Sequence, residues 1–358
     1  MSKRRKKNIR IGIWGGVGAG KATYLTMLYR YFTRSRDWKI EVHPGFSEVV
    51  VNYSQGIDEG KFPDKRFSLP EKYRSVQSLN YTLTPTKNLD INQVTLSFLA
   101  APGEFYENCC FETVPIIENQ DQYENAIDYY LHCDGIILLL DCQKAMSNNS
   151  QSYHRILGNF FTSFQQYWNT HKMQESSNIL PHYFAFCLSK ADRDTTQWNN
   201  EKETDMQREI DDLFSLGKQV IGQNVLSILQ GSSYFDFNQQ HNPAKNRCKF
   251  YYLSSIGCYF KEGKYQESVT DLENNSQNDN LEQSKSDTSV QRQNNSQSRP
   301  SGDIFRSSQP NGYSYSPKQP NGEIKLPAHS LEPLNIFAPL QWMINNIPDY
   351  PPFSEFRQ

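Results

Sequence analysis

A glycine-rich turn between an apolar strand and a helix places the strongest constraint on the fold. Residues 9–14 are expected to form the strand, and the helix that follows is expected to run to about residue 33. The turn between them fits the pattern G-x-x-x-x-G-K of a phosphate-binding loop, in which backbone N–H groups, a helix N-terminus and a lysine face phosphate oxygens. A glycine-rich turn without a ligand is the alternative. The candidate phosphate-binding residues are Gly15, Gly16, Val17, Gly18, Ala19, Gly20, Lys21, Ala22 and Thr23.

One position of this loop departs from the pattern. The residue after the lysine is normally Ser or Thr, whose hydroxyl binds the Mg²⁺ of a bound nucleotide, and this chain has Ala22 there. Thr23, the second residue after Lys21, is expected to keep a hydroxyl that faces phosphate. The loop therefore predicts phosphate binding with a weakened metal site.

Strands and helices are predicted to alternate along the rest of the chain. Residues 79–83 and 94–98 alternate apolar and polar side chains and are predicted as an antiparallel hairpin. Residues 135–141 and 183–188 are continuous apolar runs, which are typical of strands buried on both faces of a parallel sheet. The expected fold is therefore an α/β P-loop NTPase, with a mostly parallel sheet and helices on both faces.

The composition changes sharply at about residue 263. The next stretch is rich in Ser, Asn, Gln and Pro and has few apolar residues, so we expect a disordered low-complexity insertion. Apolar residues return with helical period from Ile336 to Ile347, and such a helix must bury its apolar face. The expected division is a basic N-terminal arm at 1–8, a domain at 9–262, the insertion at 263–330, and a C-terminal helix at 331–350 that completes the domain.

The net charge and the cysteine content indicate which binding partners and which cell compartment to expect. The net charge of −2 gives no bulk attraction to nucleic acid or anionic membranes, so no nucleic-acid partner is expected. The basic run at residues 3–7 is typical of a solvated tail, with membrane or nucleic-acid contact as the alternative. No transmembrane helix or signal peptide is predicted. The seven cysteines lack paired metal-binding spacing, and Cys142 and Cys187 are predicted as small core residues, which favours a reducing, cytoplasmic location.

A motif typical of guanine recognition follows the apolar run 183–188. Residues 189–192 read Ser-Lys-Ala-Asp, which fits [N/T]-K-x-D with Ser in the first place. A carboxylate at Asp192 can accept both the N1–H and the exocyclic amine of guanine, which adenine cannot supply. The stem of Lys190 would lie along the base, and Ser189 is the first residue of the motif.

Two weaker motifs follow other predicted strands. Ser255 and Ile256, after the strand at 250–253, resemble an S-A-K element, whose backbone N–H meets guanine O6. The stretch 99–104 resembles a D-x-x-G motif, in which the N–H of the glycine, here Gly103, meets the γ-phosphate.

Together these motifs resemble those of the TRAFAC-class, Ras-like GTPases, and within them the bacterial double-GTPase family. The resemblance rests on I-W-G-G-V-G-A-G-K at 13–21, A-P-G-E-F-Y at 101–106 and P-L-x-W at 339–342. It covers about residues 8–260 and 331–347. It implies a GTPase-like domain that binds GTP and GDP, often beside a second GTPase-like protein or an effector, in defensive or regulatory systems.

The chain departs from this family at its magnesium site. Ala22 and Ala100 stand where the family has residues that hold the ion or its water, and no threonine between Thr33 and Thr82 is available for the first switch. Mg²⁺ normally keeps several waters and can lose one protein ligand. Three losses leave only phosphate and water oxygens, so we expect Mg²⁺ to be poorly held.

Three hypotheses follow. The first is a guanine-nucleotide-binding pseudo-GTPase with a regulatory or scaffold role, because phosphoryl transfer depends on positioning and on charge neutralisation. Glu104, the catalytic candidate at the water-positioning place, would then face unscreened phosphates. The second is an active GTPase with unusual magnesium ligation, in which Asp141 recruits a metal; Asp141 is otherwise a polar strand end. The third is an interaction module without nucleotide.

Overall fold

The computed structural model describes residues 7–58, 76–87, 91–101, 105–109, 116–118, 121–146, 151–171, 180, 182–190, 221–229, 247–255, 259–261, 264–266, 333 and 335–347. The strands are β1 (Lys7–Gly15), β2 (Trp38–Val42), β3 (Val76–Pro85), β4 (Ile91–Leu99), β5 (Ile116–Glu118), β6 (Asp121–Tyr123), β7 (Gly135–Asp141), β8 (Tyr183–Ser189), β9 (Cys248–Leu253), β10 (Tyr259–Lys261) and β11 (Lys264–Gln266). The helices are α1 (Lys21–Arg34), α2 (Pro44–Asp58), the π-helical turn η1 (Phe105–Cys109), α3 (Ala126–Leu131), α4 (Cys142–Met146), α5 (Gln151–His171) and α8 (Ala338–Asn346), with a further helix at 221–229.

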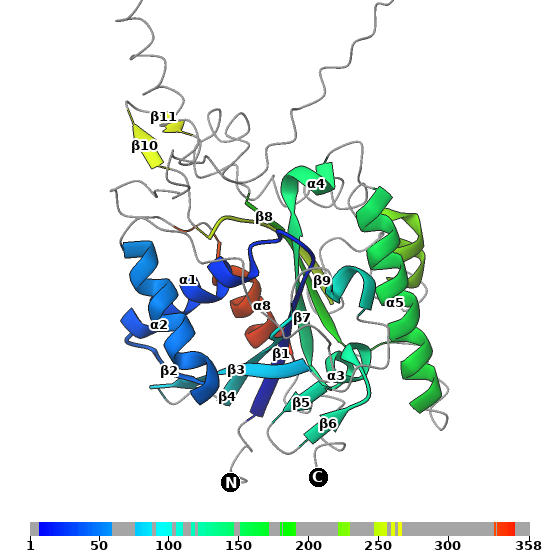
Figure 1. Ribbon diagram of the computed structural model, residues 1–358, viewed down its shortest axis with the longest axis horizontal. Coiled ribbons are helices and arrows are strands. Elements are labelled where there is room, and N and C mark those ends of the chain that lie inside the picture. Colours follow the sequence, from blue (N-terminus) through cyan, green and yellow to red (C-terminus); the bar gives the residue numbers. More distant parts are fainter. Residues whose placement is uncertain are drawn as a thin grey trace, which may run out of the picture.

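β1 lies at the centre of the sheet, between β4 and β7, and is parallel to both (Figure 1). β8 and β9 extend the sheet in parallel beyond β7. On the other side β3 is antiparallel to β4, and its outer edge pairs with β2 and β5 along different parts of its length. The predicted α/β fold, mostly parallel with an antiparallel hairpin and helices on both faces, is therefore confirmed.

β7 shows why a continuous apolar run forms a central strand. All of its residues are buried. Ile136, Leu138 and Leu140 pack into the core shared with α3 and α5, whereas Ile137 and Leu139 pack into the core shared with α1 and α8. Successive side chains of a strand point to opposite faces, so a strand covered on both faces must be apolar at every position.

α8 covers one face of the sheet beside α1. Its residues Leu340, Met343 and Ile344 are buried in the core that also contains β7 and β8. The helix approaches β7 closely at Gly135, where an added Cβ would lie only 2.9 Å from the Met343 sulfur. The Tyr24 hydroxyl of α1 donates a hydrogen bond to the Ile336 carbonyl oxygen at 3.1 Å, just before α8. The predicted amphipathic helix is thus present, with its apolar face on the sheet.

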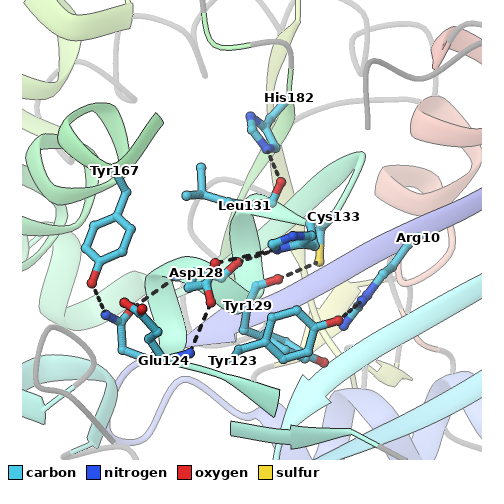
Figure 2. Close-up of polar contacts among 11 residues, drawn as sticks. Arg10, Tyr123, Glu124, Asp128, Tyr129, Leu131, Cys133, Tyr167 and His182 are labelled. Carbon is cyan, nitrogen blue, oxygen red and sulfur yellow. Dashed lines mark hydrogen bonds and ion pairs between the residues drawn. The ribbon is translucent and has the colours of Figure 1, made fainter. Parts of the chain in front are cut away.

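Arg10 joins the amino-terminal half of β1 to the region around α3 (Figure 2). Its guanidinium donates to the Tyr123 hydroxyl at 2.9 Å and lies 4.8 Å from the ring centroid of Tyr129 on α3. A cation over an aromatic ring is attracted by the negative face of the ring. These contacts help hold α3 against one face of the sheet.

α3 begins later than its sequence pattern predicts. The pattern predicts a helix near 120–132, whereas β6 occupies residues 121–123 and the helix begins at Ala126. The Asn125 side chain caps the helix by accepting the Asp128 N–H at 3.0 Å. The Asp128 carboxylate in turn accepts the Glu124 N–H at 3.0 Å. This reciprocal capping fixes the helix start.

Four cysteines pack as small core residues. Cys133, Cys142, Cys187 and Cys248 are free and buried, as predicted for Cys142 and Cys187. Burial raises the pKa of the Cys187 and Cys248 thiols, so both stay protonated and pack as apolar groups. Within the described ranges, no group of three or more His, Cys, Asp or Glu side chains could hold a metal ion. In the same ranges, no helix has the length and apolar character needed to cross a membrane.

Some sequence predictions fall outside the described residues. A helical pattern is predicted from Met206 to Leu229, and residues 221–229 of it are helical while the earlier part lies outside the described ranges. The predicted insertion at 263–330 also lies outside them, except for β11, which pairs with β10 as a short antiparallel hairpin. The first residues assigned to the insertion therefore include a strand.

Candidate functional site

The glycine-rich loop lies at the edge of the sheet where β1, β4, β7 and β8 end. Gly15 is the last residue of β1 and Lys21 is the first of α1. β1 is a switch point of the sheet, because α1 packs on one face and α3, which leads into the neighbouring β7, packs on the other. In open α/β sheets, ligands bind outside the carboxyl ends of the strands at such a point.

The backbone of the loop needs its glycines. Gly18 and Gly20 have φ angles of +75° and +78°, a left-handed conformation that costs a residue with a Cβ about 1–2 kcal/mol. Gly20 is the N-cap residue of α1, and the first turn of α1 contains no acidic side chain. The positive end of the helix dipole therefore faces the loop without a carboxylate from its own first turn.

The Lys21 ammonium lies inside the loop. It donates hydrogen bonds to the carbonyl oxygens of Gly15 and Gly16, the second at 3.2 Å. It also lies 4.3 Å from the ring centroid of Tyr106 on η1. Tyr106 is buried, and its hydroxyl donates to the Leu99 carbonyl at the end of β4 at 2.8 Å. The lysine charge is thus held between the loop and the segment that follows β4.

A carboxylate from η1 binds the same loop. The Val17 N–H donates a hydrogen bond to Glu107 Oε1 at 2.7 Å. A Cβ built on Gly16 would lie 2.5 Å from that oxygen. A side chain at residue 16 would therefore require the Glu107 carboxylate to move from this position.

A charged cluster flanks the other side of the loop. Asp141, at the end of β7, pairs with Lys190 at 2.6 Å, and both side chains are largely buried. Asp141 also accepts the Lys144 N–H at 3.2 Å, and Lys144 Nζ donates to the Val17 carbonyl oxygen at 2.9 Å. A Cβ on Gly18 would lie within 4 Å of all three side chains. The Asp141 carboxylate is thus bound by the Lys190 ammonium and by the Lys144 backbone N–H.

The first residues of the 189–192 motif join two strands. Asp141 and Ser189 are paired neighbours in the register of β7 and β8. The Ser189 hydroxyl is buried and donates to the Leu140 carbonyl at 3.0 Å. Lys190 has a φ of +60°, which is uncommon for a residue other than glycine. The Lys190 stem lies beside the loop, with its Cε 4.0 Å from a Cβ built on Gly20.

The residues at the expected magnesium positions do not fit that ion. Mg²⁺ takes oxygen ligands such as carboxylates, and neither Ala22 nor Ala100 has a side-chain oxygen. The Ala22 carbonyl oxygen accepts the Thr26 hydroxyl at 2.8 Å. The carboxylate of Asp141 is bound by a lysine.

The structure brings together only part of the predicted site. It places the loop residues, Ser189 and Lys190 at one edge of the sheet, and Ser255 follows β9 at the same edge, half-buried. Thr23 is half-buried in the first turn of α1. The predicted residues Gly103, Glu104, Asp192 and Ile256 lie outside the described residues.

Comparison with known proteins gives the family. A family model for Double-GTPase 2 matches residues 9–226, more than half of the chain. The chain belongs to the Double-GTPase 2 family. The match includes the glycine-rich loop and the 189–192 motif, so the resemblance to double-GTPases is confirmed and the chain carries a GTPase-like domain. No curated protein matches the chain.

Several solved structures are similar to this Double-GTPase 2 chain at low identity. The S. cerevisiae Ski7 GTPase-like domain bound to GTP is 15% identical, with a TM-score of 0.30 over 80% of this chain and 52% of that chain. The Chaetomium thermophilum signal recognition particle receptor SRb-GTP/SRX complex is also 15% identical, with a TM-score of 0.32 over 71% of this chain and 95% of that chain. This chain spans about half of the length of the Ski7 structure.

Two residues of this Double-GTPase 2 site were missed by the sequence analysis. Glu107 lies one residue beyond the A-P-G-E-F-Y stretch, and nothing in its sequence context predicts a contact with a loop 90 positions earlier. Lys144 follows Asp141 by three residues, which is the spacing of a helix cap. That spacing could have predicted the backbone contact, although not the reach of the Lys144 side chain to Val17.

Proposed function

We propose that this chain binds a guanine nucleotide at the glycine-rich loop. The observation that carries the proposal is the position of Lys190, which belongs to the base-reading motif and lies against the phosphate-binding loop. Its Cε is 4.0 Å from the Cβ position of Gly20, and its Nζ is 3.8 Å from that of Gly18. Asp192 is two residues further along the chain, which supports a base pocket next to the phosphates. Membership of the double-GTPase family supports the same choice of ligand.

We further propose that hydrolysis is weak or absent and that the protein is a pseudo-GTPase. The support is the chemistry of Ala22 and Ala100, which offer no side-chain oxygen to a metal. Phosphoryl transfer relies on charge neutralisation at the phosphates. A regulatory or scaffold role beside a second GTPase-like protein or an effector, in a bacterial defence or signalling system in the cytoplasm, is proposed from the family resemblance.

The base preference tests the first proposal. GTP and GDP should bind more tightly than ATP and ADP by about tenfold or more, because a buried polar group left unpaired by the wrong base costs about 1–3 kcal/mol. Asp192→Asn should remove most of this preference. Titration calorimetry with the four nucleotides measures both effects.

The control is Asp37→Asn, which makes the same chemical change at an exposed aspartate paired with Lys87. It should leave the four affinities unchanged. Equal affinities for guanine and adenine nucleotides in the unaltered chain would contradict the guanine assignment.

A further inference from the structure

The contact between Glu107 and the loop places an anion where the loop chemistry calls for phosphate. Backbone N–H groups of a phosphate-binding loop act as donors to phosphate oxygens. In this structure the Val17 N–H donates instead to the Glu107 carboxylate, at 2.7 Å. That distance is typical of a strong, charge-assisted hydrogen bond. The loop is therefore occupied by an anion from its own chain.

The position of Lys21 shows which part of a nucleotide this anion would meet. In a phosphate-binding loop the lysine reaches the β- and γ-phosphates. Lys21 contacts the ring of Tyr106, the residue directly before Glu107. The Glu107 carboxylate therefore approaches the loop from the side of the terminal phosphates rather than from the side of the sugar and base.

In the segment 105–109, the first two residues are fixed in the core, whereas Glu107 is less buried. Phe105 and Tyr106 are buried, and the Tyr106 ring meets Trp14 edge to face with centroids 6.1 Å apart. Glu107 is half-buried and is in contact with the loop. A rotation of its side chain can thus release the Val17 N–H while the aromatic residues before it stay in the core.

We propose that Glu107 competes with the terminal phosphate of the bound nucleotide for the loop and so determines how many phosphates the site accepts. This inference rests on the proposed nucleotide site. Two anions cannot share the Val17 N–H, and their charges repel. A triphosphate must displace the carboxylate from the Val17 N–H. A diphosphate lacks the terminal phosphate and therefore competes less strongly with the carboxylate. Glu107 therefore weakens the binding of GTP more than that of GDP.

The test compares Glu107→Gln and Glu107→Ala with the unaltered full-length chain. Tripolyphosphate serves as a probe without a base, and GTP and GDP are measured beside it by titration calorimetry. Glu107→Ala should bind tripolyphosphate and GTP about tenfold more tightly than the unaltered chain, the size expected for one charge-assisted hydrogen bond. Glu107→Gln should gain less, because its amide oxygen can still accept the Val17 N–H although its charge is gone. GDP affinity should rise by less than about threefold, because the shorter ligand has less need of the Val17 N–H. Glu48→Gln, an exposed glutamate on α2, makes the same charge change away from the loop and should have no effect.

The outcomes separate this inference from the guanine proposal. Equal or weaker tripolyphosphate binding by the Glu107 variants overturns the inference. The inference also fails if neither the unaltered chain nor any variant binds tripolyphosphate, because removing the competing carboxylate would then not have opened the loop. Tighter tripolyphosphate binding without any preference for GTP over ATP supports the inference and contradicts the guanine assignment. In the unaltered chain, saturating tripolyphosphate should also shift the NMR signal of the Glu107 side-chain carboxylate as it leaves the Val17 N–H, a result that does not depend on how the variants fold.

Discussion

Ending the chain before residue 331 should abolish cooperative unfolding of the domain. The truncation removes five large buried apolar side chains, namely Ile336, Leu340, Met343, Ile344 and Ile347. Burial of each contributes roughly 1.5–3 kcal/mol, so their loss is similar to the roughly 5–15 kcal/mol by which a whole domain is stable. Thermal unfolding followed by circular dichroism should then show no sharp transition.

Three further variants serve as controls for the truncation. Leu340→Ala should lower the free energy of unfolding by about 2–5 kcal/mol. Gln341→Ala, at an exposed position of the same helix, should change it by less than about 0.5 kcal/mol. Replacing residues 267–328 with a short flexible linker should leave the melting temperature nearly unchanged, because each doubling of a loop costs only about 0.6 kcal/mol. A truncated chain that melts like the full chain would contradict the role of α8 in this domain.

Chelating magnesium should change the affinity for GTP by less than about threefold, since neither Ala22 nor Ala100 offers an oxygen ligand to the ion. The attraction that remains comes from Lys21 and the loop N–H groups, which do not need a metal. The double variant Ala22→Thr with Ala100→Asp should make GTP binding depend on magnesium by about tenfold or more, because contacts to one ion couple by about 0.5–3 kcal/mol. Titrations with and without EDTA measure this dependence.

The two single variants are the control and should gain much less magnesium dependence than the double variant. GTP turnover by the unaltered chain should stay close to the uncatalysed rate. Turnover of several GTP per minute that EDTA abolishes would contradict the pseudo-GTPase proposal. It would instead support an active GTPase with unusual magnesium ligation, for which Asp141 is the first ligand to replace.

The sheet and its covering helices could be predicted from the sequence because their apolar patterns are local. β7 and β8 are predicted by continuous apolar runs, since helices cover both of their faces. α8 is predicted by the spacing of Leu340, Met343 and Ile344. The short strands β5 and β6 have no such pattern, because three residues that pair at the edge of a sheet need no periodic apolar face.

The site was predicted less completely than the fold. The glycine-rich loop has a sequence pattern because its backbone requires glycine at residues 18 and 20. Glu107 and Lys144 reach the loop from other elements, and which side chains meet there depends on how those elements pack. The pattern also could not show that the Ser189 hydroxyl would bind β7. Residues that act through tertiary contacts leave no periodic signal.

The position of α8 affects the order in which the protein can fold during synthesis. About 85 residues separate the end of β9 from the start of α8. At the usual rate of synthesis this interval takes roughly 4–17 s. The face that contains α3 and α5 can be covered during that time, while Ile137 and Leu139 on the other face still lack α8. A nascent chain thus exposes an apolar surface until α8 is made, and this is the stage at which a chaperone would bind it most readily.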